Sequence, residues 1–331
     1  MAANGKMPAM PNYTRAIPLL LAAASVFSTT AAAQPYPSKP IRMMVPAAPG
    51  GVTDVVARLI APQLTEILGQ PIIVDNRSGA GGIPGTDTVA KASADGYTLL
   101  TVFDSFISNP FVFGSAPYDT IKDFAPVSLL IRGPQLFVTH PKLGLKSFNE
   151  LLALAKSRRA PLNFATAGAA TSSRLSVELF KATARLDATL IHYKGGGPAL
   201  TDLLGGHVEA MIASAGLVMA QVKSGRLTAL AVTSRERSPL VPGVPAVSEF
   251  VPQFEAQSWV GVLAPAATPR AIVKQLNEAL RNAIQQPEAR ERFAQQGYEI
   301  VGSTPEQFGS WIRSESGKWG KIIRERGITA E

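Results

Sequence analysis

Short apolar runs alternate with apolar residues at helical spacing along most of the chain. The runs in the first third predict β-strands at 41–45 (IRMMV), 72–76 (IIVDN) and 98–103 (TLLTVF). Between the first two runs, apolar residues recur every three or four positions, which predicts a helix. These positions are Val56, Ile60, Leu64 and Ile67.

The middle third repeats this scheme and the last third is helical. Predicted strands are 162–166, 189–193, 208–213 and 227–233, and predicted helices are 148–157 and 174–184. Alternating strands and helices favour parallel sheets and the α/β class. Later helices are expected to start at Thr268-Pro269, at Pro287 and at Thr304-Pro305. The last of these has Gln307 placed for a capping box, and Gly327 suits its C-terminal end.

The N-terminus is typical of a secretory signal peptide over residues 1–33. Lys6 and Arg15 provide positive charge, residues 17–27 are apolar, and an A-x-A site predicts cleavage after Ala33. The alternative is a buried N-terminal helix. No cysteine is present, which excludes disulfides, a thiolate nucleophile and a cysteine-linked lipid anchor. We therefore expect a periplasmic protein that is not embedded in the membrane, with about 300 mature residues in two domains.

The net charge is +8, but basic residues are dispersed along the chain. The densest cluster, 318–326, lies on a predicted helix that also carries Glu325, which favours a solvated helix face over a nucleic-acid site. A diffuse positive field would steer small anions towards the protein.

The usual catalytic and cofactor motifs are missing. No G-x-x-x-x-G-K-[ST] or G-x-S-x-G sequence occurs, and Pro84 spoils the third glycine of a dinucleotide loop that starts at Gly79 and Gly81. The three histidines have no metal-ligand spacing. No cofactor or metal is therefore predicted.

Loops rich in glycine and hydroxyl residues follow the predicted strands. They cover residues 50–54, 104–110, 167–173 and 193–197. Backbone N–H groups at helix N-termini bind anions, and loops at strand C-termini converge on ligand crevices. The alternative is that these glycines only form tight turns. Their equivalent placement favours an anion-binding crevice.

Motifs spread over the mature chain carry a family resemblance. They include VPAAPGGVTDVVAR, LGQPIIVDNRSGAGG, YDTIKDFAPVSLL, YKGGGPALTDLLGGHVEAM, GRLTALAVTSRERSPLVPGVPAVSE and SWVGVLAPAATP. In this series the chain resembles the Bug family, the periplasmic solute receptors of tripartite tricarboxylate transporters.

The resemblance implies a two-lobed α/β periplasmic-binding-protein fold of the type II, flytrap kind, with a ligand cleft between the lobes. Lobe 1 would comprise residues 34–135 and 259–331, and lobe 2 residues 136–258. The crossings would fall near 128–139 and 259–264. It further implies a small carboxylate ligand and a membrane permease as partner. A monomer is the default.

The resemblance also implies the ligand-binding residues, matched motif by motif. They are Ala48, Gly50, Gly51, Asp54, Asn109, Gly168, Thr171, Ser172, Tyr193, Lys194 and Gly195. Asp54 is interpreted as a helix-capping and loop-fixing residue rather than a direct contact.

Two positions depart from the family pattern, and Asp104 is added to the candidate site. Family members commonly have a small neutral residue at Asp104 and often histidine at Arg174. If Asp104 faces the cleft, the hypothesis is a ligand with an amine or ring nitrogen; otherwise Asp104 turns away. The nearby aromatic residues suit a ring-bearing ligand or, the preferred interpretation, core packing. They are Phe103, Phe106, Phe111 and Phe113.

The predicted function is therefore capture and release of a carboxylate for uptake by a permease. The alternatives are a receptor of the same fold that serves a membrane sensor, and, more distantly, an enzyme on this scaffold.

Overall fold

The computed structural model describes residues 35–330 apart from positions 194, 240 and 253, together with positions 1, 2, 5 and 9. Apart from those four positions, the expected signal peptide and its cleavage site lie outside the described residues. The chain divides into Met1–Pro35 and Tyr36–Glu331, and the elements below all belong to the second unit. Among the described residues, no helix is long and apolar enough to cross a membrane.

Ten strands form one continuous sheet in the order β2-β1-β3-β9-β4-β7-β5-β6, with β8 and β10 also paired to β4. The strands are β1 (Ile41–Val45), β2 (Ile72–Asn76), β3 (Thr98–Phe103), β4 (Phe124–Thr139), β5 (Leu162–Thr166), β6 (Ala188–His192), β7 (Ala210–Ser214), β8 (Thr228–Val232), β9 (Gln257–Pro265) and β10 (Glu299–Ile300). All seven predicted strands are therefore present: four have the predicted bounds, and three have ends shifted by one or two residues.

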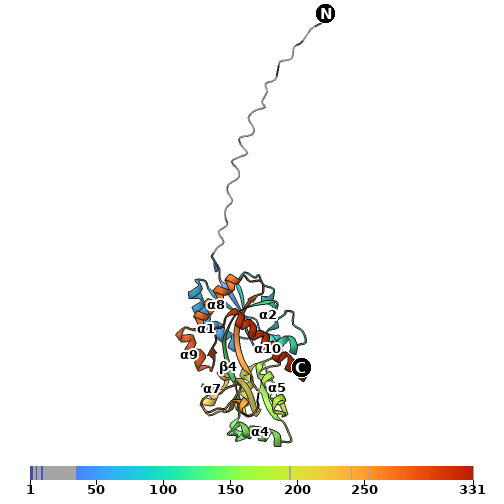
Figure 1. Ribbon diagram of the computed structural model, residues 1–331, viewed down its shortest axis with the longest axis vertical. Helices are drawn as coiled ribbons and strands as arrows, with labels where there is room; N and C mark the ends of the chain where they lie inside the picture. The colour runs from blue at the N-terminus through green and yellow to red at the C-terminus, as the bar shows by residue number, and fades with distance from the viewer. Residues whose placement is uncertain are drawn as a thin grey trace. The chain divides into compact units, whose positions relative to one another are not determined.

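The long strand β4 joins two lobes (Figure 1). Its part from Phe124 to Pro134 pairs with β9, and its part from Gln135 to Thr139 pairs with β7 and β8. The first lobe is thus built on β1, β2, β3 and β9, and the second on β5, β6, β7 and β8. The two-lobed α/β architecture expected from the resemblance is confirmed.

Strand direction is mixed, whereas the sequence predicted parallel sheets. β1 pairs in parallel with β2 and β3, and β5 pairs in parallel with β6 and β7. β4 and β9, which link the lobes, are antiparallel to each other, and β9 is antiparallel to β3. The chain returns from the second lobe to the first through Ala256, whose backbone amide donates to Thr233 O. Ala256 precedes residues 259–264, where the crossing was predicted. Those residues pair within the first lobe.

Ten α-helices and three short 3₁₀ turns cover the described sheet. The α-helices are α1 (Val52–Leu68), α2 (Ile83–Ala90), α3 (Ser105–Val112), α4 (Phe148–Ser157), α5 (Ser172–Ala184), α6 (Gly196–Gly205), α7 (Ala215–Lys223), α8 (Arg270–Ile284), α9 (Pro287–Gln295) and α10 (Pro305–Arg326). The 3₁₀ turns are η1 (Ala80–Gly82), η2 (Pro141–Leu143) and η3 (Val247–Glu249). The predicted capping box of α10 is present, with Thr304 accepting from Gln307 N, and Gly327 ends the helix in the left-handed conformation.

Two local predictions were wrong. The predicted loop 104–110 is the start of helix α3, which tolerates Pro110 because its many buried side chains pack into the core. Helix α5 begins at Ser172 rather than Arg174, inside the predicted loop 167–173. The predicted helix from Val56 to Ile67 is present within α1, with Ile67 at 40% exposure near its end.

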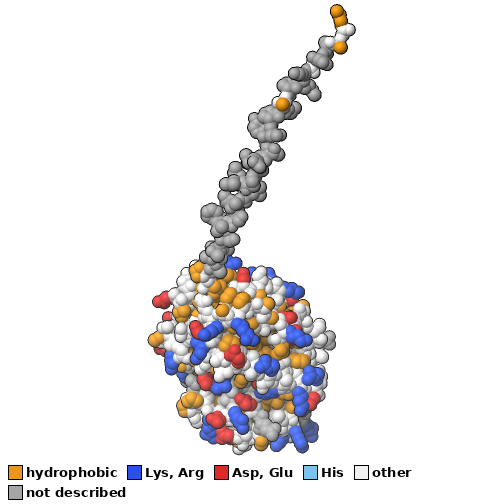
Figure 2. Space-filling model, turned by 45° about the horizontal axis from the view of Figure 1, so that its top comes forward, with side chains coloured by type: hydrophobic (Ala, Val, Ile, Leu, Met, Phe, Trp, Pro, Cys, Tyr) orange, Lys and Arg blue, Asp and Glu red, His pale blue; other side chains and the backbone are white. Residues whose placement is uncertain are grey.

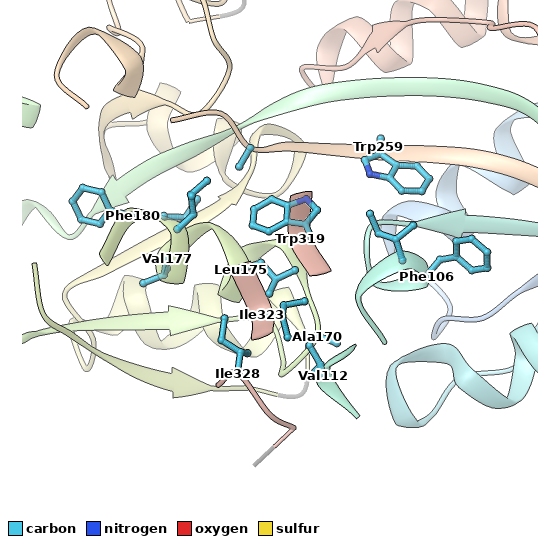
Figure 3. Packing of buried hydrophobic residues seen from close by; sticks show 14 of the residues in the cluster. Phe106, Val112, Ala170, Leu175, Val177, Phe180, Trp259, Trp319, Ile323 and Ile328 are labelled. Atoms are coloured by element: carbon cyan, nitrogen blue, oxygen red, sulfur yellow. The ribbon is translucent and has the colours of Figure 1, made fainter. Parts of the chain in front are cut away.

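The largest apolar cluster crosses the junction of the lobes (Figure 3). It contains Phe106 of α3, Leu175 of α5, Trp259 of β9 and Trp319 of α10, so the preferred interpretation of Phe106 as a core residue is confirmed. Surface charges are interspersed on the face shown in Figure 2, as expected for a chain whose basic residues are dispersed.

Candidate ligand-binding site

The loop after β1 is held by Asp54, which lies in the first turn of α1. Its carboxylate accepts hydrogen bonds of 2.9 Å from the Gly50 amide, from Arg58 Nε and from Asn76 Nδ2. Burial raises the pKa of Asp54, but these donors outweigh that effect, so the pKa lies below its ordinary value. Asp54 therefore makes the contacts of a loop-fixing residue. Ala48, Gly50 and Gly51 lie in the loop that it holds.

A glycine loop around η1 packs between this first loop and α3. A Cβ atom on Gly82, which has a φ of +89°, would lie 2.5 Å from Pro46 O, so only glycine fits there. Asn109 Nδ2 donates to Gly81 O at 2.8 Å, and Asn109 is only 1% exposed. Asn109 thus supports the glycine loop, and a ligand contact for it stays a prediction.

The two predicted loops of the second lobe meet each other. Gly195 N donates to Ala167 O at 3.1 Å, and Thr171 Oγ1 donates to Gly168 O at 2.9 Å. The Tyr193 hydroxyl is turned to Asp202 Oδ2 at 2.6 Å. Lys194, the remaining candidate of this loop, lies outside the described residues.

Asp104 connects the lobes at the N-terminus of α5. It follows β3 in the first lobe, is 5% exposed, and accepts from Ser172 N of the second lobe at 3.2 Å through Oδ1. Next to it, Ser108 Oγ donates to Ala170 O at 2.8 Å. Burial raises the pKa of Asp104 to about 6, against the lowering effect of hydrogen bonds from Ser172 and Ser105. Asp104 therefore faces the opposite lobe.

A buried hydrogen-bond chain links this contact to the strand that joins the lobes. Gln135 Nε2 donates to Ser172 Oγ at 2.6 Å, and Ser176 Oγ donates to Gln135 Oε1 at 2.5 Å. The backbone amide of Gln135 also donates to Thr233 Oγ1 at 2.8 Å. Sequence reasoning missed Gln135, although a glutamine within the apolar stretch LLIRGPQLFV is a signal of a buried polar role.

Arg174, the second departure from the family pattern, binds the C-terminal segment. Its Nη1 donates to Ala169 O at 3.0 Å and to Thr329 O at 2.5 Å. Burial lowers the pKa of this guanidinium. In the described part of the chain, no cluster of three or more His, Cys, Asp or Glu residues could hold a metal ion.

The geometry therefore defines a two-lobed binding protein with loops from both lobes meeting at the end of β3. The model of the tripartite tricarboxylate transporter family receptor matches residues 56–328, and the chain belongs to that family. It is similar to Protein BugT of Bordetella pertussis, with 42% identity over 328 residues that cover 96% of this chain and 98% of BugT. The family consists of receptors, which supports the interpretation of a binding protein over an enzyme.

Two solved structures are similar over nearly all of the folded unit. Rpa4515 of R. palustris, solved with adipate, has a TM-score of 0.82 and 32% identity, covering 88% of this chain and 99% of that chain. MatC (Rpa3494) of Rhodopseudomonas palustris, solved with malate bound, has a TM-score of 0.79 and 32% identity, covering 87% of this chain and 100% of that chain. Both carry the two-lobed fold.

Proposed function

We propose that this protein is a periplasmic receptor that binds a small carboxylate between its lobes and presents it to a membrane permease. The observation that carries the proposal is that the lobes meet where Asp104 accepts from Ser172 N, while the N-terminus of helix α1 in the first lobe has no side-chain cap and can accept a ligand carboxylate. The carboxylates in the adipate and malate complexes of similar receptors support it. Residues 34–135 and 259–331 form one proposed lobe, and 136–258 the other.

The proposed ligand site is formed by the loops at the strand ends. It comprises Ala48, Gly50, Gly51, Asp54, Asp104, Asn109, Gly168, Thr171, Ser172, Tyr193, Lys194 and Gly195. Helix α1 contributes unpaired N–H groups because its N-cap, Gly51, makes no side-chain capping bond. A ligand carboxylate at this end is stabilised by the helix dipole and by charge-assisted hydrogen bonds.

The test is calorimetric titration of the protein from Gln34 onwards with monocarboxylates, dicarboxylates, tricarboxylates, amino acids and aromatic acids. Mononucleotides and inorganic phosphate serve as controls. Saturable binding of a carboxylate class supports the proposal. Binding of nucleotide or phosphate without any carboxylate would contradict it.

A matched pair of glycine variants locates the site. Gly50 and Gly243 have φ values of +81° and +85°, and a Cβ would meet nothing within 4 Å at either position. Each Gly→Ala change should cost a similar 1–2 kcal/mol of backbone strain, roughly. Only Gly50→Ala, which disturbs the loop before α1, should weaken carboxylate binding, by about tenfold or more. Equal affinities in the two variants would place the site elsewhere.

A further inference from the structure

Asp104 is a buried carboxylate whose described partners are all uncharged. Its Oδ1 accepts from Ser172 N at 3.2 Å, and the Ser172 hydroxyl and the Ser105 amide also act on the carboxylate. Among the described residues, no lysine, arginine or histidine lies within 4.0 Å of it, the limit for an ion pair. Buried charges in proteins are usually paired, since hydrogen bonds alone do not replace the lost hydration. Asp104 has no such cation among the described residues.

Of the two groups that act on Asp104 from other elements, Glu315 adds negative charge and Tyr298 stays neutral. Glu315 of α10 is 9% exposed, and its charge raises the pKa of Asp104. The Glu315 carboxylate is itself held by Trp319 Nε1 at 2.9 Å and by Lys318 Nζ at 3.7 Å. Tyr298, which precedes β10, has its pKa raised to about 12 by burial, with a contribution from Asp104. This side of the junction therefore attracts a cation.

A second buried polar atom, near the end of the β3–β9 pair, lacks a partner within the described chain. The β3–β9 pair ends at the register Phe103↔Val260, and Asp104 follows the first of these residues while Trp259 precedes the second. Trp259 is fully buried, and its Nε1 has no hydrogen-bond partner within the described chain. Figure 3 shows its indole in the cluster that also contains Trp319. A carboxylate that has only neutral donors among the described residues matches a ligand with a cationic group.

The two helix N-termini therefore differ in what they can accept. The N-terminus of α5 already has Asp104 on its Ser172 amide, so a second carboxylate there would meet a like charge. The N-terminus of α1 is free of a side-chain cap. A dicarboxylate would have only one of its two anionic ends accommodated.

We propose that Asp104 is a specificity-determining residue that selects a carboxylate carrying a protonated nitrogen. This inference rests on the proposed function. The ligand carboxylate binds at the α1 N-terminus, and the ammonium group pairs with Asp104, which keeps its hydrogen bond to Ser172. The same residue rejects dicarboxylates by charge repulsion.

The experiment compares ligands of equal chain length that differ only at one end. The probes are succinate, 4-aminobutyrate and butyrate, then adipate, 6-aminohexanoate and hexanoate, with the standard amino acids beside them. Affinities are measured by calorimetry at neutral pH for the wild type, Asp104→Asn and Asp95→Asn. Asp95 is the matched control, because it is a partly exposed aspartate that pairs with Lys39.

In the wild type and in Asp95→Asn, the best amino carboxylate should bind at least about tenfold more tightly than its dicarboxylate counterpart. Asp104→Asn keeps an acceptor for Ser172 N but loses the charge. It should lose about tenfold or more for the amino carboxylate and gain affinity for the dicarboxylate. An unchanged circular dichroism spectrum of Asp104→Asn, with a melting temperature no lower than that of wild type, excludes misfolding as the cause.

Three results would overturn the inference. A wild-type preference for dicarboxylates, unchanged in Asp104→Asn, removes the role of Asp104 and leaves the carboxylate receptor intact. A wild-type dicarboxylate preference that disappears in Lys194→Ala identifies Lys194 as the charge that governs selection. Absence of binding by every carboxylate, in wild type and variants alike, rejects the proposed function together with the inference.

Discussion

Two buried aspartates stand at helix N-termini in this protein, and they differ in their partners. Asp54 is 2% exposed and Asp104 is 5% exposed, so burial hardly distinguishes them. Asp54 serves its own helix and is compensated by Arg58, whereas Asp104 reaches from the first lobe to α5 in the second. The pKa of Asp54 accordingly lies below its ordinary value, and that of Asp104 rises to about 6.

The difference shows how to separate a structural carboxylate from a functional one. Asp54 has three donors, one of them charged, and its charge is satisfied by its own loop. Asp104 has only neutral donors among the described residues and a like charge, Glu315, nearby. A carboxylate that is buried without a compensating cation lowers the stability of the fold. Such groups are typical of functional sites.

The largest effect on stability is expected for Asp54→Ala. The change removes the acceptor of the Gly50 amide, Arg58 and Asn76, and leaves the amide without a partner. Because Arg58 is 53% exposed, its share is small, and the loss should be about 2–4 kcal/mol of unfolding free energy. Urea unfolding at neutral pH measures it. Asp95→Ala, which loses a surface ion pair with Lys39 and the acceptor of Tyr97 N at 3.1 Å, should lose only about 1 kcal/mol; equal losses would refute the role of Asp54.

Asp104→Asn should instead increase the free energy of unfolding at neutral and alkaline pH. The raised pKa means that the folded state holds a proton more tightly than the unfolded state, so wild-type stability falls as pH rises from about 4 to 6. The variant lacks this loss and should be more stable than wild type at pH 8, by up to about 3 kcal/mol. The difference should vanish below pH 4, roughly. Urea unfolding over this pH range tests it, and parallel profiles for the two proteins would show that Asp104 is compensated.

Asp54 should give the reverse pH dependence. Because its folded pKa is lowered, its contribution is present at neutral pH and is lost as pH falls through the ordinary value and below. The difference between wild type and Asp54→Asn should therefore shrink in acid. A difference that grows in acid would contradict the assignment of its partners.

The smallest effect is expected for Ser172→Ala, which removes the hydroxyl between Asp104 and Gln135. Gln135 loses one acceptor, at a cost of about 1 kcal/mol. The pKa of Asp104 should rise further, so the pH transition moves upwards. Ser173→Ala is the matched control, because Ser173 lies in the same turn of α5 as Ser172. Its Oγ donates at 2.7 Å to Ile212 O of β7 instead. Ser173→Ala should lose similar stability without shifting the pH transition of Asp104. A shift in both variants would mean that neither serine acts on Asp104 directly.

Local structure was predictable wherever it depended on nearby residues. The strands 41–45, 72–76, 98–103 and 162–166 have the bounds that their apolar runs indicated. The Thr304 capping box needs only residues three apart, and it is present. By contrast, α3 was missed because its buried face depends on packing with α10 and the core, which outweighs the signals of Asp104 and Pro110 for a loop.

The sequence by itself determined the α/β class, the glycine loops, the family and the presence of an aspartate at position 104. Only the tertiary structure decided where that aspartate points. Asp104 and Ser172 are 68 residues apart in the chain, and they meet because β4 and β9 bring the end of β3 against the N-terminus of α5. Gln135 joins Ser172 in the same way, across 37 residues. Contacts of this kind depend on how the lobes pack, and neither spacing nor periodicity within the chain encodes that packing.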